Sequence, residues 1–149
     1  MHVNVLMAEA GDCPIAAYQE SNGETVYLWQ QTFEDGVNDL VMSKTTPERG
    51  DAKRVTFGGS RQLGCHYLAL AIARGGDWGW HIAWSNEHGV FYARMDGEAW
   101  VSSPPKLISS SPAKQLSFEK AEAKLKLSWE PLDPVAPAYA VSNDEGRSW

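Results

Sequence analysis

The chain has 149 residues, and its 43% hydrophobic and 21% charged residues are typical of one folded globular domain. A formal net charge of −6 leaves no clustered lysine and arginine for phosphate contacts, so we expect no nucleic-acid partner. No apolar run approaches the roughly 20 residues that a membrane-spanning helix needs, so we expect no membrane span.

The N-terminal run HVNVLMA, residues 2–8, predicts a strand. It lacks the basic start and the long apolar core of a signal peptide. The alternative is the tail of a processed or misannotated leader, which would place the protein outside the cytoplasm; otherwise a cytoplasmic location is expected.

Three similar stretches of strand-like sequence follow. Each carries a tryptophan near the end of an alternating run, and Trp29, Trp84 and Trp129 recur roughly 50 residues apart, close to the blade length of a propeller. Dipeptides typical of tight antiparallel hairpins, such as Asn22-Gly23 and Asp35-Gly36, connect the runs. The expected strands lie at residues 14–20, 24–31, 38–44 and 52–58, then 66–73, 80–87, 89–96 and 105–109, then 116–123, 124–131 and 137–144.

The third stretch contains an ambiguity. Residues 116–127 are rich in good helix formers with Glu and Lys spaced for pairing, which is the alternative to a strand. The alternation in LKLSW favours a strand.

These patterns predict a single all-β domain made of antiparallel four-stranded sheets of the propeller-blade type. The repeats span about residues 10–59, 60–112 and 113–149. The third repeat lacks a fourth strand, so we expect strand 2–8 to complete it, because a free sheet edge is a liability.

The terminal sequence SNDEGRSW fits the pattern Ser-x-Asp-x-Gly-x-x-Trp, with Ser142, Asp144, Gly146 and Trp149 at the named positions. It resembles the Asp-box, or bacterial neuraminidase repeat, of sialidase-like β-propellers. The stretch MDGEAW looks like a shortened version. It keeps Asp96, Gly97 and Trp100.

The resemblance implies a blade turn in which serine and aspartate bond the backbone while tryptophan packs beneath. Sialidases have six blades, so a three-blade chain implies half of a six-bladed ring formed by a homodimer, or a fragment. The alternative is a domain of three sheets packed without a pore. The expected function is non-catalytic recognition of a carbohydrate or protein ligand. The alternative is a sialidase-type exo-glycosidase whose catalytic residues lie on absent or partner blades, since no catalytic residue carries over by motif. No cofactor is expected.

The densest candidate site is GGDWGWHIAWSNEHG, residues 75–89. Aromatic faces stack on sugar C–H surfaces while polar groups bond hydroxyls, so this hairpin is a candidate glycan subsite. Its candidate ligand-binding residues are Asp77, Trp78, Trp80, His81 and Asn86. The alternative is that Trp80 and Trp84 pack between blades. His81 and His88 lack metal-ligand spacing, so no metal site is expected.

Cys13 and Cys65 match no metal motif. Two reduced, buried cysteines and a single disulfide are both open interpretations. A disulfide would imply an oxidising compartment.

Overall fold

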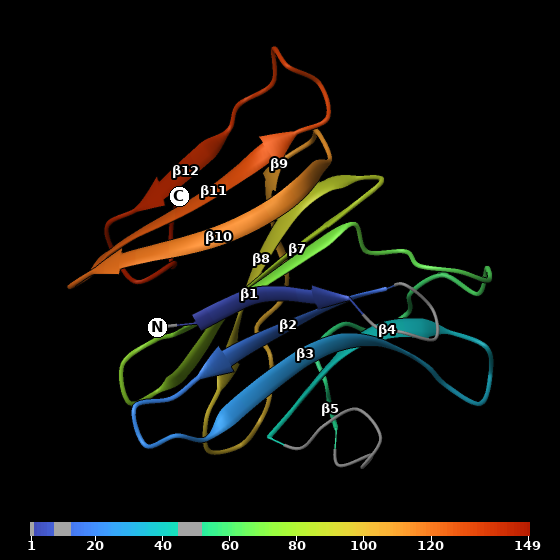
Figure 1. The fold of residues 1–149 in the computed structure, drawn as a ribbon, viewed down its shortest axis with the longest axis horizontal. Coiled ribbons are helices and arrows are strands. Elements are labelled where there is room, and N and C mark those ends of the chain that lie inside the picture. The colour runs from blue at the N-terminus through green and yellow to red at the C-terminus, as the bar shows by residue number, and fades with distance from the viewer. Residues whose placement is uncertain (1, 8–12, 45–51) are drawn as a thin grey trace.

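Three antiparallel β-sheets make up the fold in the computed structural model, which describes residues 2–7, 13–44 and 52–149 (Figure 1). The protein is therefore all-β, as the alternating patterns predicted. Among the described residues, no helix could cross a membrane.

The first sheet has the strand order β1-β2-β3-β4-β5. Its strands are β1 (His2–Met7), β2 (Pro14–Gln19), β3 (Thr25–Thr32), β4 (Asn38–Ser43) and β5 (Lys53–Arg54). The second sheet consists of β6 (Ala69–Arg74), β7 (Gly79–Asn86), β8 (Gly89–Asp96) and β9 (Lys106–Ser109) in that order. The third sheet consists of β10 (Ala113–Ala121), β11 (Lys124–Pro131) and β12 (Tyr139–Ser142).

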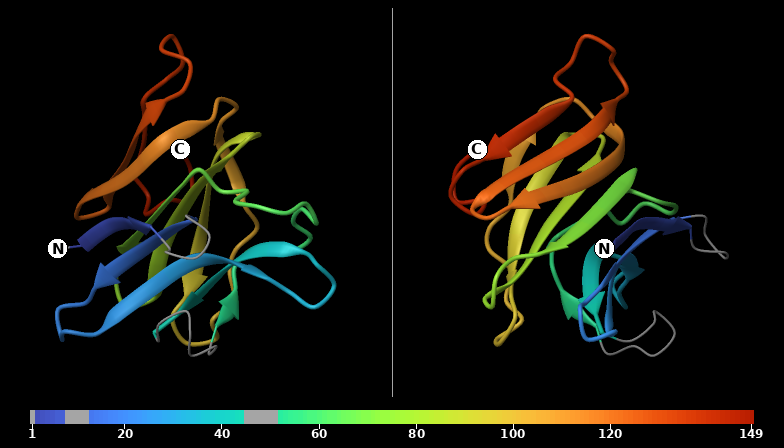
Figure 2. Two further views of the ribbon diagram at one scale, coloured as in Figure 1. Left: turned by 45° about the vertical axis from the view of Figure 1, so that its right-hand side comes forward. Right: turned by 60° about the vertical axis from the view of Figure 1, so that its left-hand side comes forward.

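The second sheet lies between the other two, as the views in Figures 1 and 2 agree. Strand β6 alternates alanine with larger residues, so its two faces differ. The large side chains Leu70 and Ile72 pack into one core with the first sheet, whereas Ala69 and Ala71 face a second core shared with the third sheet. Both faces of this sheet are therefore buried, which accounts for its near-continuous apolar sequence.

In the core between the second and third sheets, small side chains of one sheet pack against large side chains of the other. The alanines of β6 leave room for bulky side chains from β10 and β11, since interiors pack to high density. These bulky residues are Leu116, Phe118, Leu125, Leu127 and Trp129.

The segment that was ambiguous between helix and strand forms β10 and β11. The strand prediction is confirmed and the helix alternative is wrong. Side chains alternate along both strands: Leu125 and Leu127 are buried, while Lys124 is exposed. A half-buried strand requires this period of two, which outweighs the helix propensity of the individual residues.

The predicted closure of the third sheet by residues 2–8 is wrong. Strand β1 pairs antiparallel with β2, in a register that places His2 opposite Tyr18 and Met7 opposite Pro14. Strands that are close in sequence pair most readily, which favours β2 over the distant β12. The expected four strands per sheet are found only in the second sheet; the first has five and the third has three.

Strand β1 is therefore paired within the first sheet and does not complete the third one. Strand β1 also lies against β6, near the middle of the molecule (Figure 1). The homodimer and the propeller arrangement therefore remain predictions.

Candidate functional site

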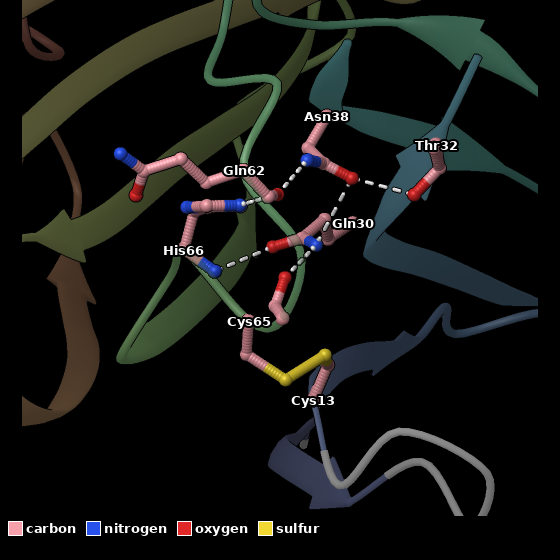
Figure 3. The surroundings of a disulfide bond; sticks show 8 residues. Cys13, Gln30, Thr32, Asn38, Gln62, Cys65 and His66 are labelled. Carbon is pink, nitrogen blue, oxygen red and sulfur yellow. Dashed lines mark hydrogen bonds between the residues drawn. A yellow bond between two sulfur atoms is a disulfide. The ribbon is translucent and has the colours of Figure 1, made fainter. Parts of the chain in front are cut away.

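A loop without regular strands, residues 58–68, connects the first sheet to the second. We call it the pinned loop, because side chains of β3 and β4 bind its backbone. Asn38 at the start of β4 is almost fully buried, and its Nδ2 donates to Ser60 O at 2.9 Å and to Gln62 O at 2.8 Å. Thr32 Oγ1 donates to Asn38 Oδ1 at 2.5 Å and holds the amide in this orientation (Figure 3).

Gln30 on β3 holds the next part of the pinned loop. Its Nε2 donates to Gly64 O at 2.9 Å, and its Oε1 accepts from the His66 backbone N–H at 2.8 Å. Between these two contacts, Cys65 forms a disulfide with Cys13, with the Cα atoms 5.3 Å apart (Figure 3). Of the two interpretations left open by the sequence, the structure shows the disulfide.

The beginning of the pinned loop is bound by Asp39, which is fully buried. Asp39 Oδ1 accepts hydrogen bonds from Thr56 Oγ1 at 2.7 Å and from Gly59 N–H at 3.1 Å. Its Oδ2 pairs with Arg54 at 2.6 Å. Gly59 also lies so close to the Asn38 carbonyl that a Cβ would overlap it, so this position requires glycine.

A pocket of about 590 Å³ lies between the pinned loop and the turn that joins β7 to β8. This volume is within the range of small-ligand sites. Apolar and polar groups line it in similar amounts. Its lining includes Ser60, Leu63, Cys65, His66, Leu68 and Asn86.

Two polar side chains of the pocket have a defined donor or acceptor role. His66 Nε2 contacts the Gln62 carbonyl oxygen at 2.6 Å; since a carbonyl only accepts, Nε2 carries a proton, and the tautomer of the neutral ring with this proton has Nδ1 as its acceptor. Asn86 Oδ1 accepts from the His88 backbone N–H at 2.8 Å. Its Nδ2 group has no hydrogen-bond partner within residues 13–44 and 52–149, so it is a free donor.

The five candidate ligand-binding residues from the sequence lie in different surroundings. Asn86 lines the 590 Å³ pocket, whereas Asp77 lines a second pocket, of about 490 Å³, near the opposite end of β7. Trp80 is buried and packs against Trp100 with ring centroids 4.9 Å apart. The structure therefore separates Asn86 from the other four.

Trp78 and His81 do come together, at the interface between the second and third sheets. Their rings meet edge to face at 5.0 Å, and the Arg94 guanidinium lies 3.9 Å over the Trp78 ring. Trp78 is half-buried in this arrangement. Stacking on a sugar is favoured by a freely exposed ring, which Trp78 does not present.

His81 is fully buried within a chain of polar contacts. Its Nδ1 is 2.6 Å from the Tyr92 hydroxyl, and its Nε2 is 3.5 Å from Glu145 Oε2. Burial lowers the pKa of His81 to about 4, although the Glu145 charge opposes this shift. Burial acts to raise the pKa of Glu145, but hydrogen bonding and charge from Lys120, with the His81 charge, lower it on balance.

The terminal turn is held by side chains at the motif positions. Ser142 Oγ donates to Asp144 Oδ1 at 2.7 Å and accepts from Gly146 N–H at 2.8 Å. Hydrogen bonds from Ser148 and Ser142 hold the pKa of the Asp144 carboxyl well below its usual range. The Trp149 ring packs edge-on against Tyr92 at 4.8 Å, so the turn is attached to the second sheet.

The shortened motif forms the turn after β8. Asp96 Oδ2 accepts from Ala99 N–H at 2.7 Å, and Gly97 N–H donates to Trp78 O at 2.7 Å. Trp100 then packs on the first core.

Sequence reasoning missed the pinned loop. Its signals were the polar residues Gln30, Asn38 and Asp39 within otherwise strand-like runs. Their partners in the pinned loop lie 20 to 36 residues away and carry no local pattern.

We expect Gly146→Ala to lower the free energy of unfolding more than Gly36→Ala. Both glycines have φ near +85°, at +85° and +83°, where alanine costs about 1 kcal/mol. A Cβ at Gly36 meets open space, whereas a Cβ at Gly146 overlaps the Tyr92 ring and adds about 2 kcal/mol of overpacking. Urea unfolding of both variants measures the difference; equal losses would contradict the packing of this turn on Tyr92.

We also expect the protein to lose stability as pH falls from 6.5 toward 4. In this window unfolded His81 binds a proton that the folded form excludes, so stabilisation present above pH 6.5 decreases on acidification, on the order of 3 kcal/mol in total. His81→Gln should flatten the slope of unfolding free energy against pH, while the exposed-residue control His88→Gln should keep it. An unchanged slope in His81→Gln would overturn this assignment.

Comparison of the chain with protein-family models, curated proteins and solved structures gives no match.

Proposed function

We propose that the protein is a non-catalytic recognition module of the sialidase-like propeller type that binds carbohydrate in the pocket beside the pinned loop. The observation that carries this proposal is that side chains of the first sheet, the buried Asn38 and Asp39 and the half-buried Gln30, bind the backbone of an irregular loop. Recognition residues are commonly placed on loops that a scaffold holds in position.

The pinned loop is preorganised. Asn38 and Gln30 each make two hydrogen bonds to its backbone, and Asp39 makes one. None of these bonds continues a sheet, so they stabilise a loop conformation instead. A loop that is already ordered loses less entropy when it binds, which increases affinity.

The lining of the pocket suits a polyhydroxylated ligand. Asn86 Nδ2 offers a donor and His66 Nδ1 offers an acceptor, while Leu63 and Leu68 offer apolar contacts for C–H groups. A sugar presents the same alternation of hydroxyl and C–H surface. A protein partner is the other ligand class, and Leu63, 98% exposed, would then be a contact residue.

The terminal turn supports the proposed family type. Ser142 and Asp144 bond the turn backbone and Trp149 packs beneath, which is the arrangement that the Asp-box resemblance implies. Disulfides form and persist in oxidising compartments, so we expect the protein to acquire the Cys13–Cys65 bond, and with it this pocket wall, in such a compartment.

The proposal predicts that the labelled protein binds specific members of an array of neutral and acidic oligosaccharides. Asn86→Ala should weaken the affinity for a bound glycan about tenfold, corresponding to the loss of one hydrogen bond. Asn143→Ala is the matched control, because Asn143 is exposed on the terminal turn, outside this pocket. Calorimetry on the array hits measures both variants. No binding across the array, or equal losses in the two variants, would contradict carbohydrate recognition at this pocket.

A further inference from the structure

We propose that the Cys13–Cys65 disulfide is a redox latch of the pocket: reduction by a dithiol releases residues 63–66 of the pinned loop and weakens ligand binding. The effect on binding rests on the proposed function, whereas the release of the loop does not.

The position of the disulfide makes it part of the site. Cys65 lines the pocket and is exposed, and Cys13 is half-buried beside the start of β2. The bond joins residues separated by 52 positions and ties the pocket wall to the first sheet. A change in this bond therefore acts directly on a residue of the pocket wall.

The remaining contacts hold the parts of the pinned loop unequally. Residues 59–62 are held by Asp39 and by Asn38, which is 4% exposed. Around Cys65, by contrast, the side-chain hydrogen bonds that reach from the first sheet, among the described residues, are the two of Gln30, to Gly64 O and from His66 N–H. The His66 ring bonds Gln62 O within the loop itself. The contact with Gly64 is exposed to solvent, where a hydrogen bond contributes little. The two residues that follow His66 are held without the disulfide: Tyr67 is buried in the first core with its hydroxyl 3.2 Å from Thr56 Oγ1, and Leu68 N–H donates to Ser85 O at 2.7 Å. Reduction should therefore loosen residues 63–66 and leave residues 59–62 in place.

The chemical step is thiol–disulfide exchange. A thiolate of the dithiol attacks Sγ of Cys65, the more exposed of the two residues, the Sγ–Sγ bond breaks, and Cys13 leaves as a thiolate. The second thiol of the reductant then displaces Cys65, forming the cyclic disulfide of the reductant. Two electrons and two protons pass from the dithiol to the two cysteines.

Amide hydrogen exchange read by NMR tests the latch in the intact chain, before and after dithiothreitol, with both thiols counted by titration. We expect the His66 amide, which donates to Gln30, to exchange at least tenfold faster after reduction. The Gly59 amide and the amides of β6 to β8 should keep their rates. The Cys13→Ser/Cys65→Ser double variant should resemble the reduced protein and show no response to dithiothreitol.

Two results would overturn the latch. If both thiols are free and the His66 amide keeps its exchange rate, the hydrogen bonds of Gln30 are enough to hold this segment without the disulfide. If all amides lose protection together, the disulfide stabilises the whole fold instead of this segment.

Array glycans that bind the oxidised protein should bind the reduced protein at least tenfold more weakly, and equal affinity would contradict control of binding. If no glycan binds either form, the proposed function fails, while the exchange rates still decide the release of the loop.

Discussion

Burial of both faces of the second sheet is the constraint on which the rest of the structure depends. Its large side chains meet the first sheet, and its alanines meet the bulky side chains of the third sheet. Each buried Leu or Ile contributes about 1.5–3 kcal/mol relative to exposure, so the two cores hold three sheets together without a closed ring among the described strands. The polar far side of β11, with Lys124 and Glu130 exposed, is where the stack of sheets ends.

The position of the candidate site follows from this stacking. The chain must cross from the first sheet to the second after β5, and the pinned loop makes this crossing. Because β3 and β4 are already held by the first core, their polar residues Gln30, Asn38 and Asp39 can bind the loop from a rigid base. The last residue of β7, Asn86, then lines the pocket from the second sheet. The pocket is thus formed between two sheets whose relative placement is determined by the core.

Most strands were predictable from the sequence, because alternation and turn dipeptides are local signals. Strands β8 and β11 match their predicted ranges, and β10 is a strand because Leu116 and Phe118 share one buried face. The partner of β1 was not predictable: a short apolar strand can join any free edge, and only the assembled sheets determine which edge is available.

The site was predictable only in part. The motif SNDEGRSW correctly located a turn that Ser142 and Asp144 hold by hydrogen bonds. The candidate ligand-binding residues, by contrast, are clustered in the sequence but are not all clustered in space. Asn86 and Asp77 belong to the same short stretch, residues 75–89, yet line different pockets, because the extended strand β7 separates them. The disulfide and the contacts of Gln30 join residues far apart in the chain, for which the sequence contains no periodic signal.

The central claim is that the pinned loop is as rigid as the strands that hold it. Backbone ¹⁵N relaxation of the oxidised protein tests this claim most directly. We predict order parameters near 0.85 for residues 59–66, equal to those of β3 and β7. Values below about 0.6 across these residues would mean that the contacts of Asn38, Gln30 and the disulfide do not order the loop, and the account of a preorganised site would be wrong.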